Sequence, residues 1–274
     1  MNKLLPSLFI VLVTLPAAAR DRVVAHPRPL PAPASILWIA AHPDDEAVAA
    51  PLLASWCRDG HVRCSFLLFT RGEAGVCLRA GGCLPDIATV RSSEAGAASQ
   101  YFGAESLLLT LPDGGGSVPP SWSLQEGDQT ALVRRVARYI EAVAPDLILT
   151  FDPRHGTTCH PDHRAVGEIV IAAVELLSQP PQVYLLESRV TYVAEPFAVH
   201  FAPAFQDADR FDATLLLAST AGPAWNAVVD DMQHHPSQFD SHWIAAIQSV
   251  PSFERAVFIA PMATALSIPV EPCP

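Results

Sequence analysis

Apolar runs of strand length alternate with helix-like segments along most of this chain, and this alternation constrains the fold more than any other feature. The runs expected to form strands cover residues 35–41, 62–69, 107–111, 147–151, 183–186 and 256–259. They are nearly continuously apolar, which is typical of parallel strands buried on both faces of a sheet. The sequence therefore predicts a doubly wound α/β domain, with a mostly parallel sheet covered by helices on both faces.

Helices are expected between these strands. They cover residues 49–58, 87–101, 129–143, 161–177, 223–234 and 242–248. Asp86 and Asp128 stand directly before two of them, and an aspartate there can cap the free backbone N–H groups of a helix. Pro51 is tolerated only in the first turn of a helix, so residues 42–48 are expected to form the loop that joins the first strand to the first helix.

The first nineteen residues have the pattern of a secretory signal peptide. Lys3 precedes an apolar run over residues 4–15, and alanines at 17–19 follow it. A transmembrane anchor is the alternative, but the run is shorter than the roughly 20 residues that a bilayer needs. We therefore expect an exported protein, periplasmic or secreted, with no stable membrane insertion after cleavage. A proline-rich lead-in over residues 20–34 and a single domain over residues 35–274 would follow the signal.

Composition narrows the class of partner. Half of the residues are hydrophobic and 16% are charged, so the chain can bury a full core. The formal net charge is −11, and no run of lysine or arginine occurs. Such a surface offers no basic face for phosphate groups, so neither nucleic acid nor an anionic membrane is an expected partner.

Export would place the cysteines in an oxidising compartment, where they tend to pair. The six cysteines are Cys57, Cys64, Cys77, Cys83, Cys159 and Cys273. Two local bridges are expected, from Cys57 to Cys64 and from Cys77 to Cys83, which leaves Cys159 for Cys273. Buried free thiols are the alternative, and a thiolate zinc site is disfavoured because no CxxC spacing occurs.

Two polar clusters follow expected strands. The first is HPDDE, residues 42–46, and the second lies within FDPRHGTTCHPDH, residues 151–163. Ligands of doubly wound folds gather at the carboxyl ends of strands, so the two clusters are expected on one rim. A satisfied polar turn would explain either cluster taken alone, but two clusters of acids and histidines together suggest a metal.

The spacing of these residues suggests which of them would hold the metal. His42 and Asp45 are three residues apart in a turn and can reach one ion, with His163 as a third ligand from across the sheet. Two imidazoles and one carboxylate, with a position left for water, are typical of catalytic Zn²⁺. Fe(II) is the alternative, because such facial sites also hold it.

These motifs resemble those of the PIG-L/LmbE-like family of zinc-dependent N-deacetylases. The resemblance rests on HPDDE and HPDH, and on LLFTRGEAG (67–75), VRSSEAGAA (90–98), LPDGG (111–115), PDLILTFDPRHG (145–156) and HPSQF (235–239). It covers most of residues 35–240. It implies a Rossmann-like three-layer α/β/α sandwich that hydrolyses an acetamide, typically on an N-acetylglucosamine unit, and the same ligands: His42, Asp45 and His163.

The resemblance also implies catalytic roles. Asp44 would be the general base, and His160 would polarise the carbonyl or protonate the leaving amine, roles that suit a carboxylate beside the metal and an imidazole. His160 needs an orienting carboxylate, for which Asp162 and Asp152 are both candidates. Glu46 is expected to hold a ligand imidazole, or alternatively to contact the N-terminus of the following helix.

Residues in the loops after other strands resemble the substrate side of the family's site. They are Arg71, Glu73 and Asp113, and Asp113 could accept a hydrogen bond from a sugar hydroxyl. Trp122 and Trp243 could stack on a sugar ring, although core or rim packing is favoured. The family's substrates differ in variable loops, so the sequence leaves the exact substrate open.

Other polar residues have structural interpretations. Arg91 and Glu94 are expected to form an ion pair, either within their helix or from helix to loop. His155 would line the pocket or be an exposed loop residue. We assign no metal to His234, His235 or His242, because HPSQF occurs in the family as a fold feature near the site.

The expected activity is therefore removal of an acetyl group from an N-acetylglucosamine-type glycan or glycoconjugate by a Zn²⁺-dependent hydrolase. Two alternatives remain open at this point. One is an amidase that acts on another N-acyl group. The other is a carbohydrate-binding protein that holds a metal but has no activity, which the presence of Asp44 argues against.

Overall fold

The computed structural model describes residues 33–114, 122, 128–188, 216–218, 223–249 and 256–267. The strands are β1 (Ser35–Ala40), β2 (Arg63–Thr70), β3 (Glu105–Leu111), β4 (Leu147–Phe151), β5 (Gln182–Ser188), β6 (Leu216–Ala218) and β7 (Ala256–Pro261). The helices are α1 (Ala50–Leu53), α2 (Ile87–Tyr101), α4 (Gln129–Val143), α5 (Gly156–Cys159), α6 (Pro161–Glu175), α7 (Pro223–His234), α8 (Ser241–Ser249) and α9 (Met262–Ser267). Two further turns are η2 (Asp45–Val48), a 3₁₀ helix, and η3 (Ala54–Arg58), a π-helix.

One sheet organises the described residues, in the strand order β3-β2-β1-β4-β5-β7-β6. The first five strands in this order run parallel, and β7 is antiparallel to both β5 and β6. The mostly parallel sheet is therefore confirmed. The sequence did not show that the strand at 256–261 reverses direction, because an apolar run carries no information about the direction of its neighbour.

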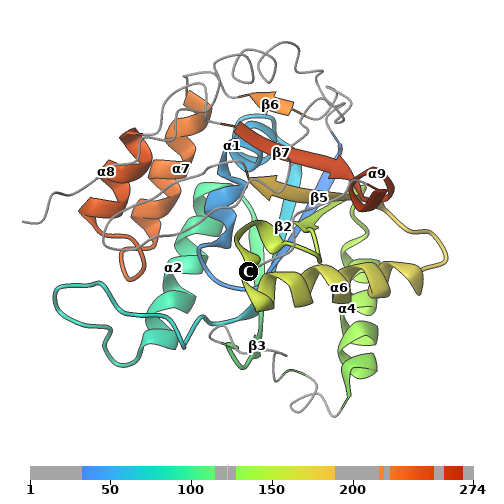
Figure 1. Ribbon diagram of the computed structural model, residues 1–274, viewed down its shortest axis with the longest axis horizontal. Helices are drawn as coiled ribbons and strands as arrows, with labels where there is room; N and C mark the ends of the chain where they lie inside the picture. Colours follow the sequence, from blue (N-terminus) through green and yellow to red (C-terminus); the bar gives the residue numbers. More distant parts are fainter. Residues whose placement is uncertain are drawn as a thin grey trace, which may run out of the picture.

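Helices cover both faces of the sheet, which makes three layers (Figure 1). Alternate residues of β1 show why, since Trp38 belongs to the core beneath α1, α2 and α7, and Ile39 to the core beneath α4 and α6. Both side chains are fully buried. A strand that feeds two cores must be apolar at every position, which is the pattern that the sequence carries.

The connection after β1 differs from the expected loop followed by a regular helix. Residues 45–48 form η2, and the segment from 50 to 58 is divided between α1 and the π-turn η3. The other expected helices begin and end close to where they were expected, whereas α5, α9 and the strand β6 were not expected. Asp86 and Asp128 cap α2 and α4, accepting hydrogen bonds from Thr89 N and Ala131 N.

Two disulfides join the expected partners, Cys57 with Cys64 and Cys77 with Cys83. Cys159 is also disulfide-bonded, and its expected partner, Cys273, lies outside the described residues. The expected signal peptide lies outside them as well. Within the part of the chain that the structure describes, no helix combines the length and the apolar character needed to cross a bilayer.

Candidate metal centre

The two polar clusters meet where β1 and β4 lie side by side. These two strands are neighbours in the sheet, and the chain winds from β1 towards β2 on one side and from β4 towards β5 on the other. Such a reversal opens a crevice at the carboxyl ends of the strands. His42 follows β1 by two residues, and His160 and His163 stand at the start of α6.

Asp45 is fixed by the backbone of its own turn. Its Oδ2 accepts hydrogen bonds from the backbone N–H groups of Ala41 at 2.9 Å and His42 at 2.8 Å. The other oxygen, Oδ1, lies 2.9 Å from His163 Nε2 and 3.6 Å from His42 Nδ1. Burial opposes ionisation, but the imidazoles of His163 and His42 outweigh it and hold the pKa of Asp45 well below its usual range.

His163 presents one ring nitrogen to the crevice. Its Nδ1 lies 3.0 Å from the carbonyl oxygen of Gly156 and donates to it when Nε2 carries the lone pair. The ring stacks on Phe151 with centroids 4.3 Å apart. A histidine that donates its far N–H to a backbone carbonyl has the tautomer and orientation typical of a metal ligand.

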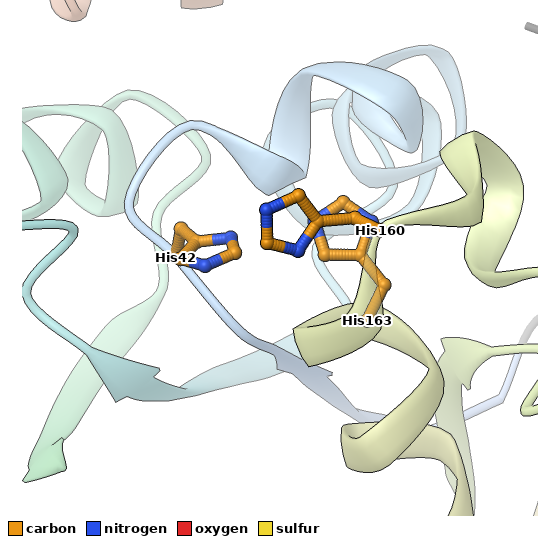
Figure 2. A group of neighbouring side chains, drawn as sticks. All are labelled: His42, His160 and His163. Atoms are coloured by element: carbon orange, nitrogen blue, oxygen red, sulfur yellow. The ribbon is translucent and has the colours of Figure 1, made fainter. Parts of the chain in front are cut away.

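Three imidazoles converge on the crevice. Figure 2 shows His42 opposite His160 and His163, which come from the other side of the site. One nitrogen of each ring lies within 4.8 Å of the other two, so the three could hold one cation. The structure therefore brings the expected ligands His42, Asp45 and His163 together, and it adds His160 at a comparable distance.

Carboxylates surround the His42 ring and favour positive charge there. Its Nε2 lies 3.2 Å from Asp162 Oδ2 and 3.3 Å from Asp113 Oδ1. Burial lowers the pKa of His42, but Asp45, Asp113 and Asp162 together raise it well above its usual value. The imidazoles offer nitrogen ligands and the carboxylates concentrate negative potential, so together they form a donor set suited to a divalent cation in a buried site.

Asp44 sits in a strained turn beside the ligands. Its φ is 99°, in the left-handed region that non-glycine residues rarely adopt. Its Oδ1 lies 2.9 Å from Arg91 Nη2, and Arg91 Nη1 also donates to the carbonyl oxygen of Gly72 at 2.8 Å. Burial raises the pKa of Asp44, and Arg91 opposes that rise.

Arg91 and Glu94 therefore do not pair within α2. Arg91 makes a helix-to-loop pair with Asp44, which was the second of the two expected arrangements. Glu94 instead accepts a hydrogen bond from the backbone N of Ser237 at 3.1 Å. The contact between Arg91 and Asp44 joins residues 47 positions apart, and the only sequence signal for it was the motif VRSSEAGAA.

Glu46 contacts a different imidazole from the one expected. Its Oε1 lies 2.8 Å from His235 Nε2, and its Oε2 accepts from Asp44 N at 3.1 Å. Glu46 therefore holds neither His42 nor His163. Asp231 is the third fully buried member of this group, and burial together with Glu46 raises the pKa of Asp231 well above its usual value.

The carboxylate expected to orient His160 is also absent among the described contacts. Asp152 is bound by Arg154, with 2.5 Å between Oδ2 and Nη2, so it does not serve as that group. The carboxylate of Asp162 lies at His42 instead, and the backbone N–H of Asp162 donates to His160 Nδ1 at 3.2 Å. Burial and the neighbouring His163 and His42 lower the pKa of His160 to about 4.

The residues expected on the substrate side differ in how directly they contact the candidate metal ligands. Asp113 reaches the site through His42, and its Oδ2 accepts from Ala74 N at 2.9 Å. Glu73 supports it by accepting from Asp113 N at 3.2 Å. Arg71 lies in the same loop as Glu73. Hydrogen bonds from Thr89, with a smaller effect of Arg71, lower the pKa of the exposed Asp86. Their roles towards a substrate stay predictions.

Two other expectations concern aromatic and histidine side chains. Trp122 is buried, packs on Phe69 with centroids 5.2 Å apart, and donates from Nε1 to the carbonyl oxygen of Pro112. Core packing is therefore its role. His155 is 1% exposed, so the exposed-loop interpretation was wrong. Trp243 packs against Phe239 at the edge of the core.

Comparison with known proteins identifies the family. Residues 37–174 match the family model described as PIG-L: GlcNAc-PI de-N-acetylase, and this match spans half of the chain. The chain belongs to the PIG-L family. The region that matches PIG-L contains His42, Asp44, Asp45, His160 and His163, whereas His235 lies outside it.

Individual relatives are similar to this chain over part of its length. The chain is 29% identical over 166 residues to a 1D-myo-inositol 2-acetamido-2-deoxy-alpha-D-glucopyranoside deacetylase of Kineococcus radiotolerans, covering 53% of this chain and 45% of that protein. It is 27% identical to a probable N-acetyl-alpha-D-glucosaminyl L-malate deacetylase 2 of Bacillus cereus, covering 60% and 74%. The chain therefore spans about half the length of the first PIG-L relative.

A solved structure supports the fold. The N,N'-diacetylchitobiose deacetylase of Pyrococcus horikoshii superposes with a TM-score of 0.59 at 14% identity, covering 85% of this chain and 86% of that one. At this level of identity the likeness concerns the architecture alone. It agrees with the expected Rossmann-like three-layer sandwich.

Proposed function

We propose that this protein is a metal-dependent N-deacetylase that removes the acetyl group from an N-acetylglucosamine-type glycan or glycoconjugate. One observation carries the proposal: His42, Asp45 and His163 converge within the PIG-L match, with Asp44 next to Asp45 in the same turn. Membership of the family supports the reaction class. The names of the two sequence relatives support an N-acetylated glucosamine conjugate as substrate.

The metal would be held by His42, Asp45 and His163, and we propose Zn²⁺. Two imidazoles and one carboxylate match the ligand set of catalytic zinc. The Gly156 carbonyl, which accepts from His163 Nδ1, supplies the outer contact that orients such a ligand. A bound Zn²⁺ supplies a Lewis acid and lowers the pKa of water to about 7.

Asp44 would act on the attacking water. Its carboxylate is next in sequence to Asp45 and is held by Arg91, so it can accept a proton from a water molecule in the crevice. The water oxygen then forms the bond to the acetyl carbon, and the bond from that carbon to nitrogen breaks. Asp44 passes its proton to the departing nitrogen, which leaves as the amine. The remaining proton of the water moves from the new carboxyl group to that amine, so the products are acetate and a protonated amine.

His160 would hold the carbonyl oxygen of the acetyl group. Because the backbone N–H of Asp162 donates to its Nδ1, the proton of the neutral ring resides on Nε2. An Nε2–H group can donate to the oxygen as it gains negative charge. Of the two roles expected for His160, the contacts therefore favour polarising the carbonyl.

Export is a further part of this proposal. The apolar run after Lys3 and the alanines at 17–19 support a cleaved signal peptide, with a single domain over residues 35–274 after the lead-in. The disulfides Cys57–Cys64 and Cys77–Cys83 support a periplasmic or secreted location, since such bonds persist in oxidising compartments.

A substrate panel tests the activity. Purified protein from residue 20 onwards is incubated with N-acetylated and long-chain N-acylated aminosugars, before and after removal of metal by a chelator. We expect acetate release that stops with the chelator and returns with Zn²⁺. Fatty-acid release would assign the protein to another acyl group, and sugar binding without turnover would refute catalysis.

Asp44→Asn tests the assignment of the base. The amide cannot accept the proton, so we expect activity to fall at least about 100-fold while metal content stays unchanged. Metal content is measured by elemental analysis of the wild type and the variant side by side. Loss of metal from the variant would mean that Asp44 is itself a ligand and that its role was exchanged with that of Asp45.

A further inference from the structure

A buried chain of contacts links the HPSQF segment to the turn that carries Asp44. His235 Nε2 lies 2.8 Å from Glu46 Oε1, and Glu46 Oε2 accepts from the backbone N of Asp44 at 3.1 Å. His235 and Glu46 are both 0% exposed. The two side chains are 189 residues apart in the sequence.

The turn needs such a contact because of its backbone. Asp44 has a φ of 99°, and a non-glycine residue in the left-handed region is strained and keeps that conformation only when its surroundings hold it there. The contact from Glu46 satisfies its N–H group in that conformation. Glu46 must itself be held, since a buried carboxylate that is free to rotate could not keep this geometry.

His235 is held from several directions. Its own backbone N donates to the carbonyl oxygen of Met232, and its carbonyl oxygen accepts from Gln238 N and Phe239 N. Ser237 N donates to Glu94 on α2, the helix that also carries Arg91. The HPSQF segment is thus hydrogen-bonded to α2. Both α2, through Arg91, and HPSQF, through His235 and Glu46, contact the turn that carries Asp44.

The contacts from α2 and from HPSQF involve different parts of Asp44. Arg91 contacts the carboxylate at 2.9 Å, while His235 reaches the backbone through Glu46. Together they would fix both the position and the direction of the carboxylate. We propose that His235 is a positioning residue for Asp44, acting through Glu46, and that this sets how well Asp44 serves as the base; the catalytic part rests on the proposed function.

A double-mutant cycle tests this proposal. We expect His235→Ala to lower kcat about 10–100-fold with KM little changed, because a base displaced by a fraction of an ångström loses its alignment. In the Asp44→Asn background the same change should cost less than about 3-fold, since there is no base left to position. Equal losses in both backgrounds would overturn the proposal.

Two further variants separate positioning from general damage. His234→Ala is the matched control, because His234 is adjacent, partly buried and directed at Tyr101, with ring centroids 5.1 Å apart. It should leave kcat unchanged. His235→Gln keeps a donor for Glu46 and should recover at least part of the lost kcat. An equally inactive Gln variant with native stability would count against the proposal.

Hydrogen exchange gives a readout that does not depend on any substrate. The amide of Asp44 donates to Glu46, so its exchange should be faster in His235→Ala and unchanged in His234→Ala. This holds even if the proposed deacetylation fails, which keeps the two proposals distinguishable. Unchanged exchange at Asp44 would overturn the positioning role.

Metal content distinguishes a positioning role of His235 from a role as a metal ligand. Glu46, Asp231 and His235 lie close enough to hold a cation, so the number of Zn²⁺ bound per chain is compared between wild type and His235→Ala. The positioning role predicts equal stoichiometry. Loss of one equivalent would overturn it and identify the three residues as a separate cation site.

Discussion

Raising the pH should weaken the folded state through the buried pair of His235 and Glu46. Burial lowers the pKa of His235, but the carboxylates of Glu46, Asp231 and Asp44 outweigh it and raise the pKa to about 9. In the unfolded chain a histidine titrates near 6.5. The native state therefore retains a proton that the unfolded state has lost between these two values.

The magnitude follows from the difference between the two pKa values. A shift from 6.5 to about 9 corresponds to about 3 kcal/mol of unfolding free energy, at roughly 1.4 kcal/mol per pKa unit. This contribution is fully present below pH 6.5 and is lost as the pH rises through 9. The raised pKa of Asp231 also makes the unfolding free energy fall as the pH rises, because the folded state again holds a proton that the unfolded state has lost. This loss begins at a lower pH than that of His235, since an unfolded aspartate titrates at lower pH than a histidine.

Urea unfolding at a series of pH values measures this loss. Metal is first removed with a chelator, so that protons released by metal binding do not contribute. The reference is Glu46→Gln/His235→Gln, in which both charges are absent and the other titrating groups remain. We expect the wild type to lose about 3 kcal/mol more than the reference between pH 6 and pH 9.5. Parallel curves would show that His235 is uncharged in the native state and refute the reasoning.

Two predictions concern the ligand and base positions directly. Gly156 has a φ of 60°, and a Cβ there would lie 2.8 Å from His163 Cβ, so Gly156→Ala should displace that ring and weaken Zn²⁺ binding about 10-fold or more in chelator competition. Gly103→Ala is the control, with a φ of 69° but open space around its Cβ, and equal affinities in the two variants would contradict the prediction. Arg91→Met should leave the effect of burial on Asp44 unopposed and raise its pKa, which moves the low-pH limb of the kcat/KM profile to higher pH. A limb that stays in place would show that Asp44 does not control it.

Much of the fold could be predicted because its signals are local. The apolar run of β1, the aspartate caps of α2 and α4, and the short spacings of the two disulfides each depend on a few neighbouring residues. The turn after β1 was less predictable. Pro51 located the start of α1 correctly, but nothing in the sequence distinguished a loop from the 3₁₀ turn η2 or a regular helix from the π-turn η3.

The candidate metal centre also has a part that the sequence predicted and a part that it did not. His42 and Asp45 are close in sequence, and parallel strands carry His163 to the same rim, so their meeting follows from the order of strands and loops. The partner that each side chain contacts was not predictable for Glu46 or Asp152. Both carboxylates have several neighbours within reach, and each one binds a partner, His235 or Arg154, that a general pattern does not select.

The sequence by itself determined a parallel α/β sheet, two bridged loops and a cluster of acids and histidines at the ends of two strands. Only the tertiary structure decided that Arg91 holds the carboxylate of Asp44, that His235 reaches its backbone through Glu46, and that the last part of the sheet reverses. The physical reason is that these contacts join side chains 47 or more residues apart. Their partners are selected by how helices pack over the sheet and by the need to pair buried charges, and neither is visible in the order of neighbouring residues.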